Sequence, residues 1–518
     1  MKKNMIKTFS SVFILTLIAK VLGLLRDIVF ANFYGTNFEA TAYFTALKIP
    51  TQIVDLVLSS AIVSTFVPVF NEVLQKDGKE KANLFANRFI NVVALIATGI
   101  SVLGMLFAPQ IVKLLAGGFD AQTYELTVQL TTITFPMVIF TAMAFSFVGL
   151  LQSYGEFNIP AMISGISNLV VIVFLLLFNQ FTGIHGVAVC MVIAWFIQLI
   201  IQIPWAKKFG YPFKLKLDYK DPNLKKVFLL AVPILISTAV LPVNNLVSTR
   251  LASGMETGAV AALEYAYKLY IVISGVFTYA VGNIIFPELS RAASEKEEES
   301  FKDIIQKAIR LLTFILIPLT LGIMLYRQDM VSVMYERGEF DATSTAETAG
   351  ALFYYTIGIL GAGLVEVMNK SFYAKQDTKT PLYVGLGVIV TNLVLSIILG
   401  NTSMTFRGLA LATSITSLLN ALVLTVIANR KTKGIVSKDL VQYIGKITIA
   451  AVGMILVVLG INYGLEKVLA GSLLKNLIRM VLGAGIGVIF YIALTTLLKV
   501  NELKGLFRKK MIEKEFFS

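Results

Sequence analysis

The sequence predicts an all-α polytopic membrane protein with fourteen transmembrane helices, arranged as two pseudo-symmetric six-helix lobes plus two C-terminal helices. Composition is the first reason: 56% of the 518 residues are hydrophobic, 15% are charged, and the mean hydropathy is +0.78. A water-soluble protein cannot hide so much apolar surface inside one core. The second reason is the recurrence of apolar stretches of about 20 residues or more, long enough to cross a bilayer as helices. The third is a repeat of motifs along the chain.

Short polar breaks divide the chain into the expected helices. They cover residues 9–34, 39–74, 84–115, 122–153, 158–179, 185–206, 225–252, 258–291, 302–326, 344–374, 380–400, 406–429, 440–463 and 474–498. The alternating strands of a membrane barrel, about ten residues each, do not fit these long stretches. The first stretch is too long for the apolar core of a signal peptide and is followed by another span, so we expect the mature protein to keep it.

Basic residues gather in the short connections on one side of the predicted membrane. That side holds Lys2, Lys3, Lys7, Lys76, Lys79, Lys81, the basic residues from Lys207 to Lys226, Arg430, Lys431, Lys433 and the tail "RKKMIEKE". The opposite loops, "GTNFEA", "AGGFDAQ", "NQFTGIH" and "ASGMETG", are nearly free of them. The positive-inside rule therefore places both termini in the cytoplasm. The net charge of +14 reflects this topology and attraction to anionic lipid headgroups, and no nucleic-acid partner is predicted.

Motifs recur at a spacing of about 220 residues. The pairs are "GGFDAQT" at 117–123 with "GEFDATS" at 338–344, Pro68 with Pro287, and Pro160 with Pro381. Six spans return the chain to the same face, so the duplication is parallel, and two such lobes are typical of alternating-access carriers. The alternative is chance similarity between apolar helices.

The repeat divides the chain into five regions. They are an N-terminal lobe (1–208), a cytoplasmic linker (209–224), a C-terminal lobe (225–433), helices thirteen and fourteen (434–500) and a basic cytoplasmic tail (501–518). Helices thirteen and fourteen carry almost no charge away from their edges, and "GAGIGVIF" supplies small residues. This region is either structural or a groove for a long hydrocarbon tail.

Charged side chains inside the predicted spans mark the candidate site, because each costs about 2.5–3.5 kcal/mol to insert and usually faces a cavity or a partner. In the first helix Lys20 and Asp27 share one stripe, and the long side chain of Arg26 can bend back toward it. Lys48 and Asp55 lie on one polar stripe of the second helix. Two polar faces in one lobe predict a shared cavity.

The second half offers matching polar faces. They comprise Asn244 and Ser248 on the seventh helix, Glu264 and Lys268 on the eighth, and Glu366 and Asn369 on the tenth. Lys48 and Lys268 lie 220 residues apart, the offset of the repeat, so each lobe would offer one lysine to a pyrophosphate between the lobes. Arg26 would add a planar fork suited to phosphate oxygens. The alternative is that the lysines form salt bridges within their own helices: Lys20 with Asp27, Lys48 with Asp55 and Lys268 with Glu264.

The stretches "LGLLRDIVFANFYG", "STFVPVFNE", "FDATSTAETAGALFYYTIG" and "KSFYAKQDTKTP" carry a resemblance over nearly the whole chain. The sequence resembles the MurJ (MviN) lipid II flippases, which belong to the superfamily of multidrug, oligosaccharidyl-lipid and polysaccharide exporters. This resemblance implies a non-enzymatic carrier in the bacterial cytoplasmic membrane. Its cargo would be lipid II, undecaprenyl-pyrophosphoryl disaccharide-pentapeptide, carried from the inner to the outer leaflet by alternating access. We expect a monomer whose partners are lipid II or a related polyprenyl-pyrophosphate glycolipid, membrane lipids and the cell-wall synthesis machinery.

The family's functional residues carry over unevenly. Arg26 matches an essential cavity arginine, whereas Lys20 and Lys268 stand where better-studied members have arginines. Val54 and Asp55 replace an arginine pair of the second helix, so Lys48 is expected to substitute. Ser248 stands where some members have an acidic residue associated with a coupling cation. Coupling to the membrane potential or to a monovalent cation therefore remains open.

Other classes of function are predicted less strongly. A flippase for another polyprenyl-linked oligosaccharide, such as a capsule or O-antigen unit, needs the same cations, and a cation-coupled multidrug exporter needs a dominant acidic site. A scaffold or an enzyme would leave the membrane charges without a purpose. The single cysteine, Cys190, excludes an internal disulfide, and His185 lies at a loop edge. No nucleophile with its base, metal cluster or phosphate-binding glycine loop is recognisable, so no catalytic residue, cofactor or metal is predicted.

Overall fold

The computed structural model describes residues 2–53, 60–214, 218, 221–238, 240–432, 434–468 and 473–500. Asp55 and the tail 501–518 lie outside the described residues. Within them the regular structure is helical, and the chain forms two compact units. Unit 1 takes the chain up to Ala261 together with the short segment Arg337–Asp341, and unit 2 takes the rest.

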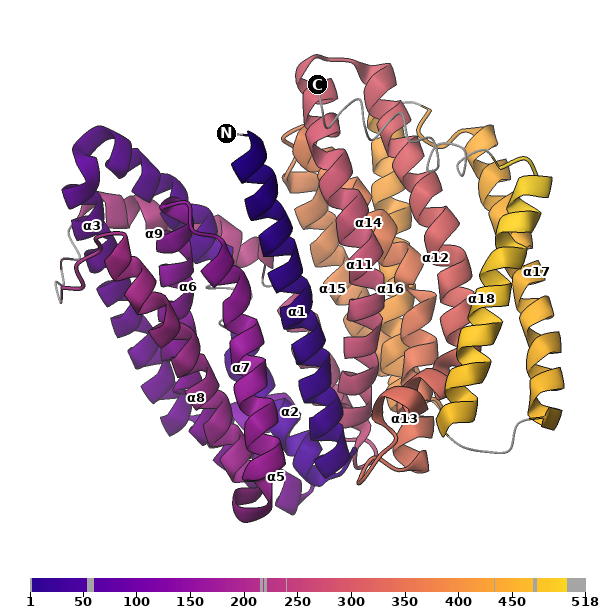
Figure 1. Cartoon of the computed structure of the whole chain (residues 1–518), viewed down its shortest axis with the longest axis horizontal. Helices are drawn as coiled ribbons and strands as arrows, with labels where there is room; N and C mark the ends of the chain where they lie inside the picture. Colours follow the sequence, from indigo (N-terminus) through magenta and orange to yellow (C-terminus); the bar gives the residue numbers. More distant parts are fainter. Residues whose placement is uncertain are drawn as a thin grey trace. The chain divides into compact units, whose positions relative to one another are not determined.

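Unit 1 is built from helices α1 to α10. Their bounds are α1 (Lys2–Tyr34), α2 (Phe38–Ile53), α3 (Ser60–Leu106), α4 (Ala108–Ala116), α5 (Ala121–Thr134), α6 (Met137–Ser153), α7 (Asn158–Leu177), α8 (Asn179–Lys208), α9 (Pro222–Thr238) and α10 (Val240–Ala252). Figure 1 shows α1 running beside α7, and α2 packs on α5. Phe30 of α1 stacks on Tyr43 of α2 with ring centroids 4.6 Å apart, which fixes the two helices that carry Arg26 and Lys48.

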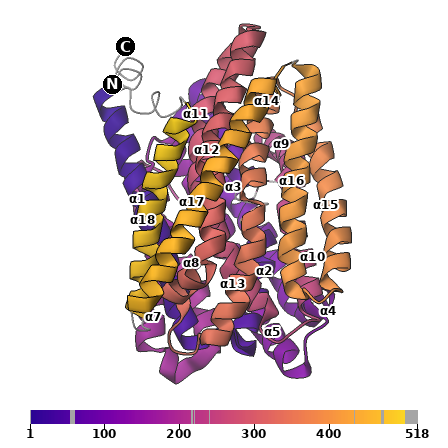
Figure 2. The ribbon, with the colours of Figure 1, turned by 90° about the vertical axis from the view of Figure 1, so that its right-hand side faces the viewer.

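Unit 2 holds the remaining helices. They are α11 (Ala259–Ser294), whose first residues belong to unit 1, α12 (Glu298–Tyr335), α13 (Ala342–Ile357), α14 (Ile359–Ala374), α15 (Lys379–Gly400), α16 (Phe406–Lys431), α17 (Lys438–Val468) and α18 (Leu473–Leu497). Figure 2 shows α15 beside α16 and α17 beside α18. Helix α12 packs on α13, α14, α17 and α18, so it lies at the centre of this unit's contacts.

Each predicted helix overlaps at least one helix of the structure, but proline or glycine breaks several of them. Pro136 lies between α5 and α6, where its missing N–H and fixed backbone interrupt the helix. Gly358 separates α13 from α14, which are bent by 41°, and its N–H donates to Ser414 Oγ at 3.0 Å. Gly78, with φ 83°, kinks α3 at the break predicted between the second and third helices.

Ten of the described helices are long and apolar enough to cross a membrane, and the bent pair of α13 and α14 would make eleven. Helix α1, whose apolar part contains Lys20, Arg26 and Asp27, is not counted among these ten. The all-α fold with many membrane spans is therefore confirmed. The count of fourteen stays a prediction.

The last four helices of each predicted half pack in a similar order. In the first half α3 packs on α6, and both α6 and α7 pack on α8. At corresponding places in the second half α12 packs on α14, and both α14 and α15 pack on α16. Acidic residues at matching positions also bind the first turns of α7 and α15: Glu156 accepts from the N–H of Asn158 at 2.9 Å, and Asp377 accepts from that of Thr380 at 3.0 Å.

Helices α9 and α10 belong to unit 1, although the repeat assigns them to the second half. Helix α9 packs on α3, and α10 packs on α2 and α4. The predicted lobes, 1–208 and 225–433, were defined by the sequence repeat, and their boundary differs from that of the contact units. That division stays a prediction.

The predicted linker is bound along α3 by buried asparagines spaced four residues apart. The side-chain amides of Asn83, Asn87 and Asn91 donate to the carbonyls of Gly210, Pro212 and Lys214 at 3.1, 2.7 and 2.9 Å. Four helical residues rise about 6.0 Å, and two extended residues span about 6.6 Å. Because these spacings nearly match, successive asparagines of α3 meet alternate carbonyls of the linker. Arg88 adds ion pairs to Asp218 and Asp221 at 2.9 and 2.7 Å.

Small residues of "GAGIGVIF" let α18 approach its neighbours closely. A Cβ on Gly483 would lie 1.7 Å from the hydroxyl of Tyr326 on α12, and one on Gly487 would lie 2.8 Å from Val458 on α17. An ion pair between Arg479 and Asp329 also joins α18 to α12. These glycines thus serve helix packing, and the groove for a hydrocarbon tail stays a prediction.

Candidate functional site

Arg26 is held in a defined orientation between α1 and α7. Its Nη2 lies 2.9 Å from Asp27 Oδ1, and its Nη1 donates to Asn168 Oδ1 on α7 at 3.1 Å. The Arg26 side chain is 26% exposed, while that of Asp27 is 12% exposed. Gly23 permits this approach, because a Cβ there would lie 3.2 Å from the amide of Asn168. Two neighbours thus orient a guanidinium that keeps part of its surface accessible.

Lys20 lies six residues before Arg26 on α1, and its side chain is exposed. Asp27, which one alternative paired with Lys20, forms an ion pair with Arg26. Leu17 and Val21, beside Lys20, are 52% and 50% exposed, so this part of α1 lies outside the packed interior of unit 1.

Lys48 on α2 reaches the polar face of α10. Its Nζ donates to the hydroxyl of Thr249 at 3.0 Å, and that hydroxyl donates to the carbonyl of Asn245 at 2.9 Å. Thr249 is buried, whereas Asn244 and Ser248 on the same helix are half-buried. The structure therefore brings Lys48 to the helix whose polar stripe the sequence predicts. Asp55, the expected partner of Lys48, lies outside the described residues.

Glu264 and Lys268 lie four residues apart on α11, and both are half-buried. The Lys268 ammonium lies 5.9 Å from the centre of the Tyr265 ring. Two further tyrosines of α11, Tyr267 and Tyr270, pack on Tyr355 of α13 with ring centroids 5.5 and 5.7 Å apart. The Tyr265 ring thus supports the Lys268 ammonium, because an aromatic face attracts a cation.

Glu366 on α14 has a partner that the sequence did not single out. Lys370 lies one turn further on, with its Nζ 3.6 Å from Glu366 Oε1 and 5.0 Å from the centre of the Phe286 ring. Gly282 of α11 faces the same carboxyl group, because a Cβ there would lie 3.1 Å from Glu366 Oε1. Asn369 is half-buried beside Lys370. Residues four apart on a helix are neighbours, so the spacing of Glu366 and Lys370 could have indicated this lysine from the sequence.

The predicted site residues thus fall into separate local groups. Lys20, Arg26, Asp27, Lys48, Asn244 and Ser248 belong to unit 1, and Glu264, Lys268, Glu366 and Asn369 belong to unit 2. Within the described part of the chain, no group of three or more histidine, cysteine or acidic side chains could hold a metal ion. Half-buried cations with hydrogen-bonding neighbours are suited to binding an anion, not to covalent chemistry.

Comparison with known proteins decides the family. The family model described as "Lipid II flippase MurJ" matches residues 30–481. The chain belongs to the MurJ lipid II flippase family. The family predicted from the sequence motifs is therefore confirmed, and membership indicates an integral membrane transporter.

MurJ relatives match along most of their length. "Probable lipid II flippase MurJ" of Vibrio cholerae is 30% identical over 81% of this chain and 82% of that protein. The protein of the same description from Rickettsia prowazekii is 29% identical over 94% of this chain and 96% of its own. "Lipid II flippase MurJ" of Burkholderia cenocepacia is 26% identical over 81% and 83%.

Solved structures support the MurJ fold. A structure described as "Lipid II flippase MurJ, inward closed conformation" aligns with a TM-score of 0.81 at 24% identity, covering 95% of this chain and 99% of that one. An inward-facing multidrug resistance MATE transporter of the MOP superfamily aligns with a TM-score of 0.67 at 14% identity, covering 80% and 96%. At these identities the likeness concerns the fold alone.

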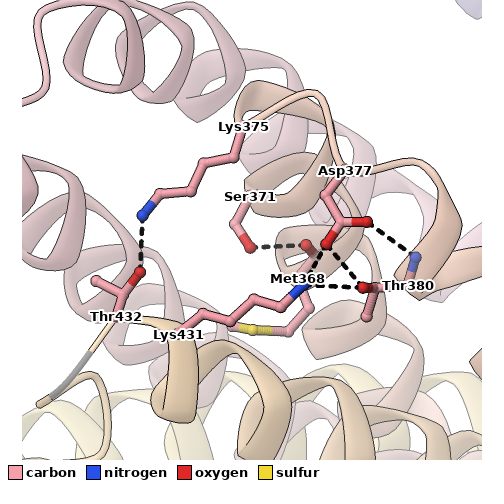
Figure 3. A network of polar contacts seen from close by, with 7 residues as sticks. All are labelled: Met368, Ser371, Lys375, Asp377, Thr380, Lys431 and Thr432. Carbon is pink, nitrogen blue, oxygen red and sulfur yellow. Dashed lines mark hydrogen bonds and ion pairs between the residues drawn. The ribbon is translucent and has the colours of Figure 1, made fainter.

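The stretch "KSFYAKQDTKTP", one of the two that resemble the MurJ flippases most specifically, connects α14 to α15 and binds the end of α16 in unit 2 (Figure 3). Lys431, at the end of α16, lies 2.5 Å from Asp377 and donates to the hydroxyl of Thr380 at 3.1 Å. Lys375 donates to Thr432 at 2.8 Å and forms an ion pair with Glu298 of α12 at 2.9 Å. Burial opposes ionisation of Asp377, but hydrogen bonds from Lys431 and Thr380 outweigh it and lower its pKa to about 2. The motif therefore fixes helix ends.

Proposed function

We propose that this chain carries lipid II, the undecaprenyl-pyrophosphoryl disaccharide-pentapeptide, from the inner to the outer leaflet of the bacterial cytoplasmic membrane. The observation that carries the proposal is the match of the MurJ family model to residues 30–481. The orientation of Arg26 by Asp27 and Asn168 supports it, because a fixed guanidinium fork suits the oxygens of a diphosphate. The protein acts as a transporter and not as an enzyme.

Cations from both halves of the repeat would hold the diphosphate. Arg26 supplies the planar fork, and Lys20, Lys48 and Lys268 supply compact charges. Asp27 pairs with Arg26, and Glu264 lies one turn from Lys268. Bound diphosphate would neutralise these like charges, which lowers the cost of bringing them together. Lipid II itself would thereby promote the change from the inward-open to the outward-open state.

The membrane potential offers a way to reset the empty carrier. A net positive empty site is drawn toward the negative interior with about 2.3 kcal/mol per charge per 100 mV. Asn244, Ser248, Glu366 and Asn369 supply polar oxygens that a monovalent cation could use. Coupling to the potential or to such a cation completes the proposed cycle.

The proposed topology has fourteen spans and both termini in the cytoplasm. Its two lobes are residues 1–208 and 225–433, joined by the linker at 209–224, and α17 and α18 would receive the hydrocarbon tail. A monomer that meets the cell-wall synthesis machinery at the membrane suffices for this function.

The second candidate function is transport of another polyprenyl-linked oligosaccharide, which would require the same cations. A cation-coupled multidrug exporter fits less well, since the MATE transporter shares only the fold, at 14% identity. Such an exporter needs a dominant acidic site, whereas the half-buried groups around Arg26 and Lys48 are centred on cations.

Complementation tests the proposal. Expression in a strain depleted of its own lipid II flippase should restore growth and cell shape, and Arg26→Ala should abolish this while the protein remains in the membrane. Arg430→Ala, at the exposed end of α16, is the matched control and should complement like the wild type. Normal growth with Arg26→Ala would defeat the assignment of Arg26. Failure of the wild-type chain at normal membrane levels would defeat the proposed cargo.

A further inference from the structure

Two loops with the same sequence motif pack against helix turns from the opposite half of the repeat. The loop 117–120 carries "GGFD" and the loop 338–341 carries "GEFD", and both were singled out by the repeat. The contacts described below lie within unit 1, with which the segment Arg337–Asp341 groups.

The first contact joins the loop 338–341 to the end of α1. The backbone N–H of Glu339 donates to the carbonyl of Asn32 at 3.0 Å. A Cβ on Gly338 would lie 2.1 Å from that same carbonyl oxygen, and one on Gly35 would lie 2.2 Å from the carbonyl oxygen of Glu339. Both glycines have positive φ, of 57° and 48°. No other residue fits at either position without moving backbone.

The second contact joins the loop 117–120 to the end of α10. The backbone N–H of Gly118 donates to the hydroxyl of Ser253 at 3.2 Å, and a Cβ on Gly118 would lie 2.5 Å from Gly254 Cα. Ser253 is 4% exposed. The motif of each half thus meets the turn that ends the first helix of the other half.

A third contact connects the two turns directly. Gly258, with φ 92°, would place a Cβ 2.5 Å from the carbonyl oxygen of Thr36. Phe340, inside the loop 338–341, is 1% exposed, so this loop is anchored by a buried ring as well as by its backbone. The four segments therefore form one continuous set of backbone contacts, which we name the clasp: residues 32–36, 117–120, 252–258 and 337–341.

We infer that the two loop contacts of the clasp open together. Three of its four segments lie in or at loops that the sequence predicts on the outer side of the membrane, so their opening would belong to the outward release of cargo, and in that respect the inference rests on the proposed function. The physical reason for joint opening is that Thr36 and Gly258 link the turns on which the two loops rest. Loosening one loop contact removes support from the other.

The test measures how accessible one loop contact is to a thiol reagent while a substitution disrupts the other loop contact. Ser253→Cys, in a Cys190→Ala background, places the sole thiol of the chain at the contact with the loop 117–120. Gly338→Ala or Gly35→Ala then forces apart the contact with the loop 338–341. The matched control is Gly183→Ala, because Gly183 also has φ 57° but a Cβ there meets nothing within 4 Å.

Purified protein in detergent is labelled with a bulky maleimide, so neither substrate nor membrane sidedness enters the measurement. We expect slow labelling of Ser253→Cys alone, labelling about tenfold faster or more with Gly338→Ala or Gly35→Ala, and no change with Gly183→Ala. Equal rates for Gly338→Ala and Gly183→Ala would overturn joint opening. Rapid labelling of Ser253→Cys alone, at the rate of an exposed thiol, would overturn the closed clasp. Failure of the wild-type chain to complement a flippase-depleted strain would overturn the proposed cargo and leave these labelling results standing.

Discussion

At the scale of single residues, Arg26 and Lys48 each bind a neutral side chain from another helix. The ammonium of Lys48 donates to Thr249, which lies 201 residues further along the chain. The hydroxyl of Thr249 is itself fixed by donating to the carbonyl of Asn245. Thr249 therefore acts as a positioning residue for Lys48.

Replacing Thr249 by valine should lower lipid II transport without unfolding the protein. Valine has nearly the same shape but offers no acceptor to Lys48. Since a hydrogen bond contributes about 0.5–1.5 kcal/mol, we expect transport to fall about twofold to tenfold. Thr249→Ser keeps the hydroxyl and should retain most of the activity, measured as flipping of lipid II in proteoliposomes. Equal losses for valine and serine would contradict a positioning role.

The sequence could identify the charged residues but not their partners. Arg26 and Lys48 stand out because a charge inside an apolar helix is costly. Asn168 and Thr249 do not stand out, because polar uncharged residues are common in helices and their roles depend on how helices far apart in sequence pack. One alternative paired Asp27 with Lys20, whereas the structure gives Asp27 an ion pair with Arg26, whose side chain was expected to bend back toward that stripe.

At the scale of helices and loops, the asparagines of α3 secure the linker. Asn87 is 2% exposed and binds the linker backbone at two residues, donating to the carbonyl of Pro212 and accepting from the N–H of Lys214 at 2.7 Å each. The side chain also accepts from the hydroxyl of Tyr211 at 2.9 Å. Losing Asn87 would leave several buried polar groups unpaired.

Asn87→Ala should destabilise the protein by about 1–3 kcal/mol, the cost of unsatisfied buried groups. Thermal unfolding in detergent would register this loss. Trypsin should also cut the linker faster near Lys207, Lys208 and Lys214. The control is Asn401→Ala, because the exposed side chain of Asn401 bonds only within its own turn, to the carbonyl of Ile397 at 2.9 Å. Unchanged linker cleavage in Asn87→Ala would show that the asparagines do not secure the linker.

The first turn of α15 offers a test that separates charge from capping. Asp377→Asn keeps an acceptor for the Thr380 N–H but loses the charge that faces Lys431, whereas Asp377→Ala loses both. We expect Asp377→Ala to be less stable than Asp377→Asn by about 1 kcal/mol, the usual value of a cap. Thermal unfolding in detergent provides the comparison, and identical stabilities would contradict capping.

The pH dependence of that stability follows from the lowered pKa of Asp377, about 2. A carboxyl whose pKa is lower in the folded than in the unfolded chain, where it is about 3.9, stabilises the fold in its ionised form. Its contribution is complete above pH about 4 and is lost as the pH falls toward 2. The difference in stability between the wild type and Asp377→Asn should therefore shrink over that range. A difference that stays constant would show that Asp377 does not titrate there.

Helix positions were predictable from apolar length, and helix breaks were predictable only in part. Gly78 falls at a polar break that the sequence marks, whereas Pro136 and Gly358 interrupt continuous apolar stretches. A single proline or glycine inside a membrane helix is compatible with either a kink or a break, since neighbouring groups can bind the released backbone. At Gly358 the hydroxyl of Ser414 does so.

At the scale of the whole molecule, the family was recognisable from motifs, and the match to residues 30–481 confirms it. The same sequence predicts a duplication, which stays a prediction, although the last four helices of each half pack in a similar order. The contact units were not predictable, because α9 and α10 associate with α2, α3 and α4 through packing that no motif records. The predicted repeat follows sequence motifs, and the units follow which helices pack together in this conformation.

Binding of lipid II to the purified protein tests the central claim, that Arg26 holds the diphosphate, most directly. Because a hydrogen bond to a charged group contributes about 1.5–3 kcal/mol, Arg26→Ala should bind lipid II about 10- to 150-fold more weakly than the wild type. Arg430→Ala should bind it like the wild type. Undecaprenyl pyrophosphate should compete with lipid II for the wild-type protein. If Arg26→Ala bound lipid II as tightly as the wild type does, the account of Arg26 as the diphosphate ligand would be contradicted.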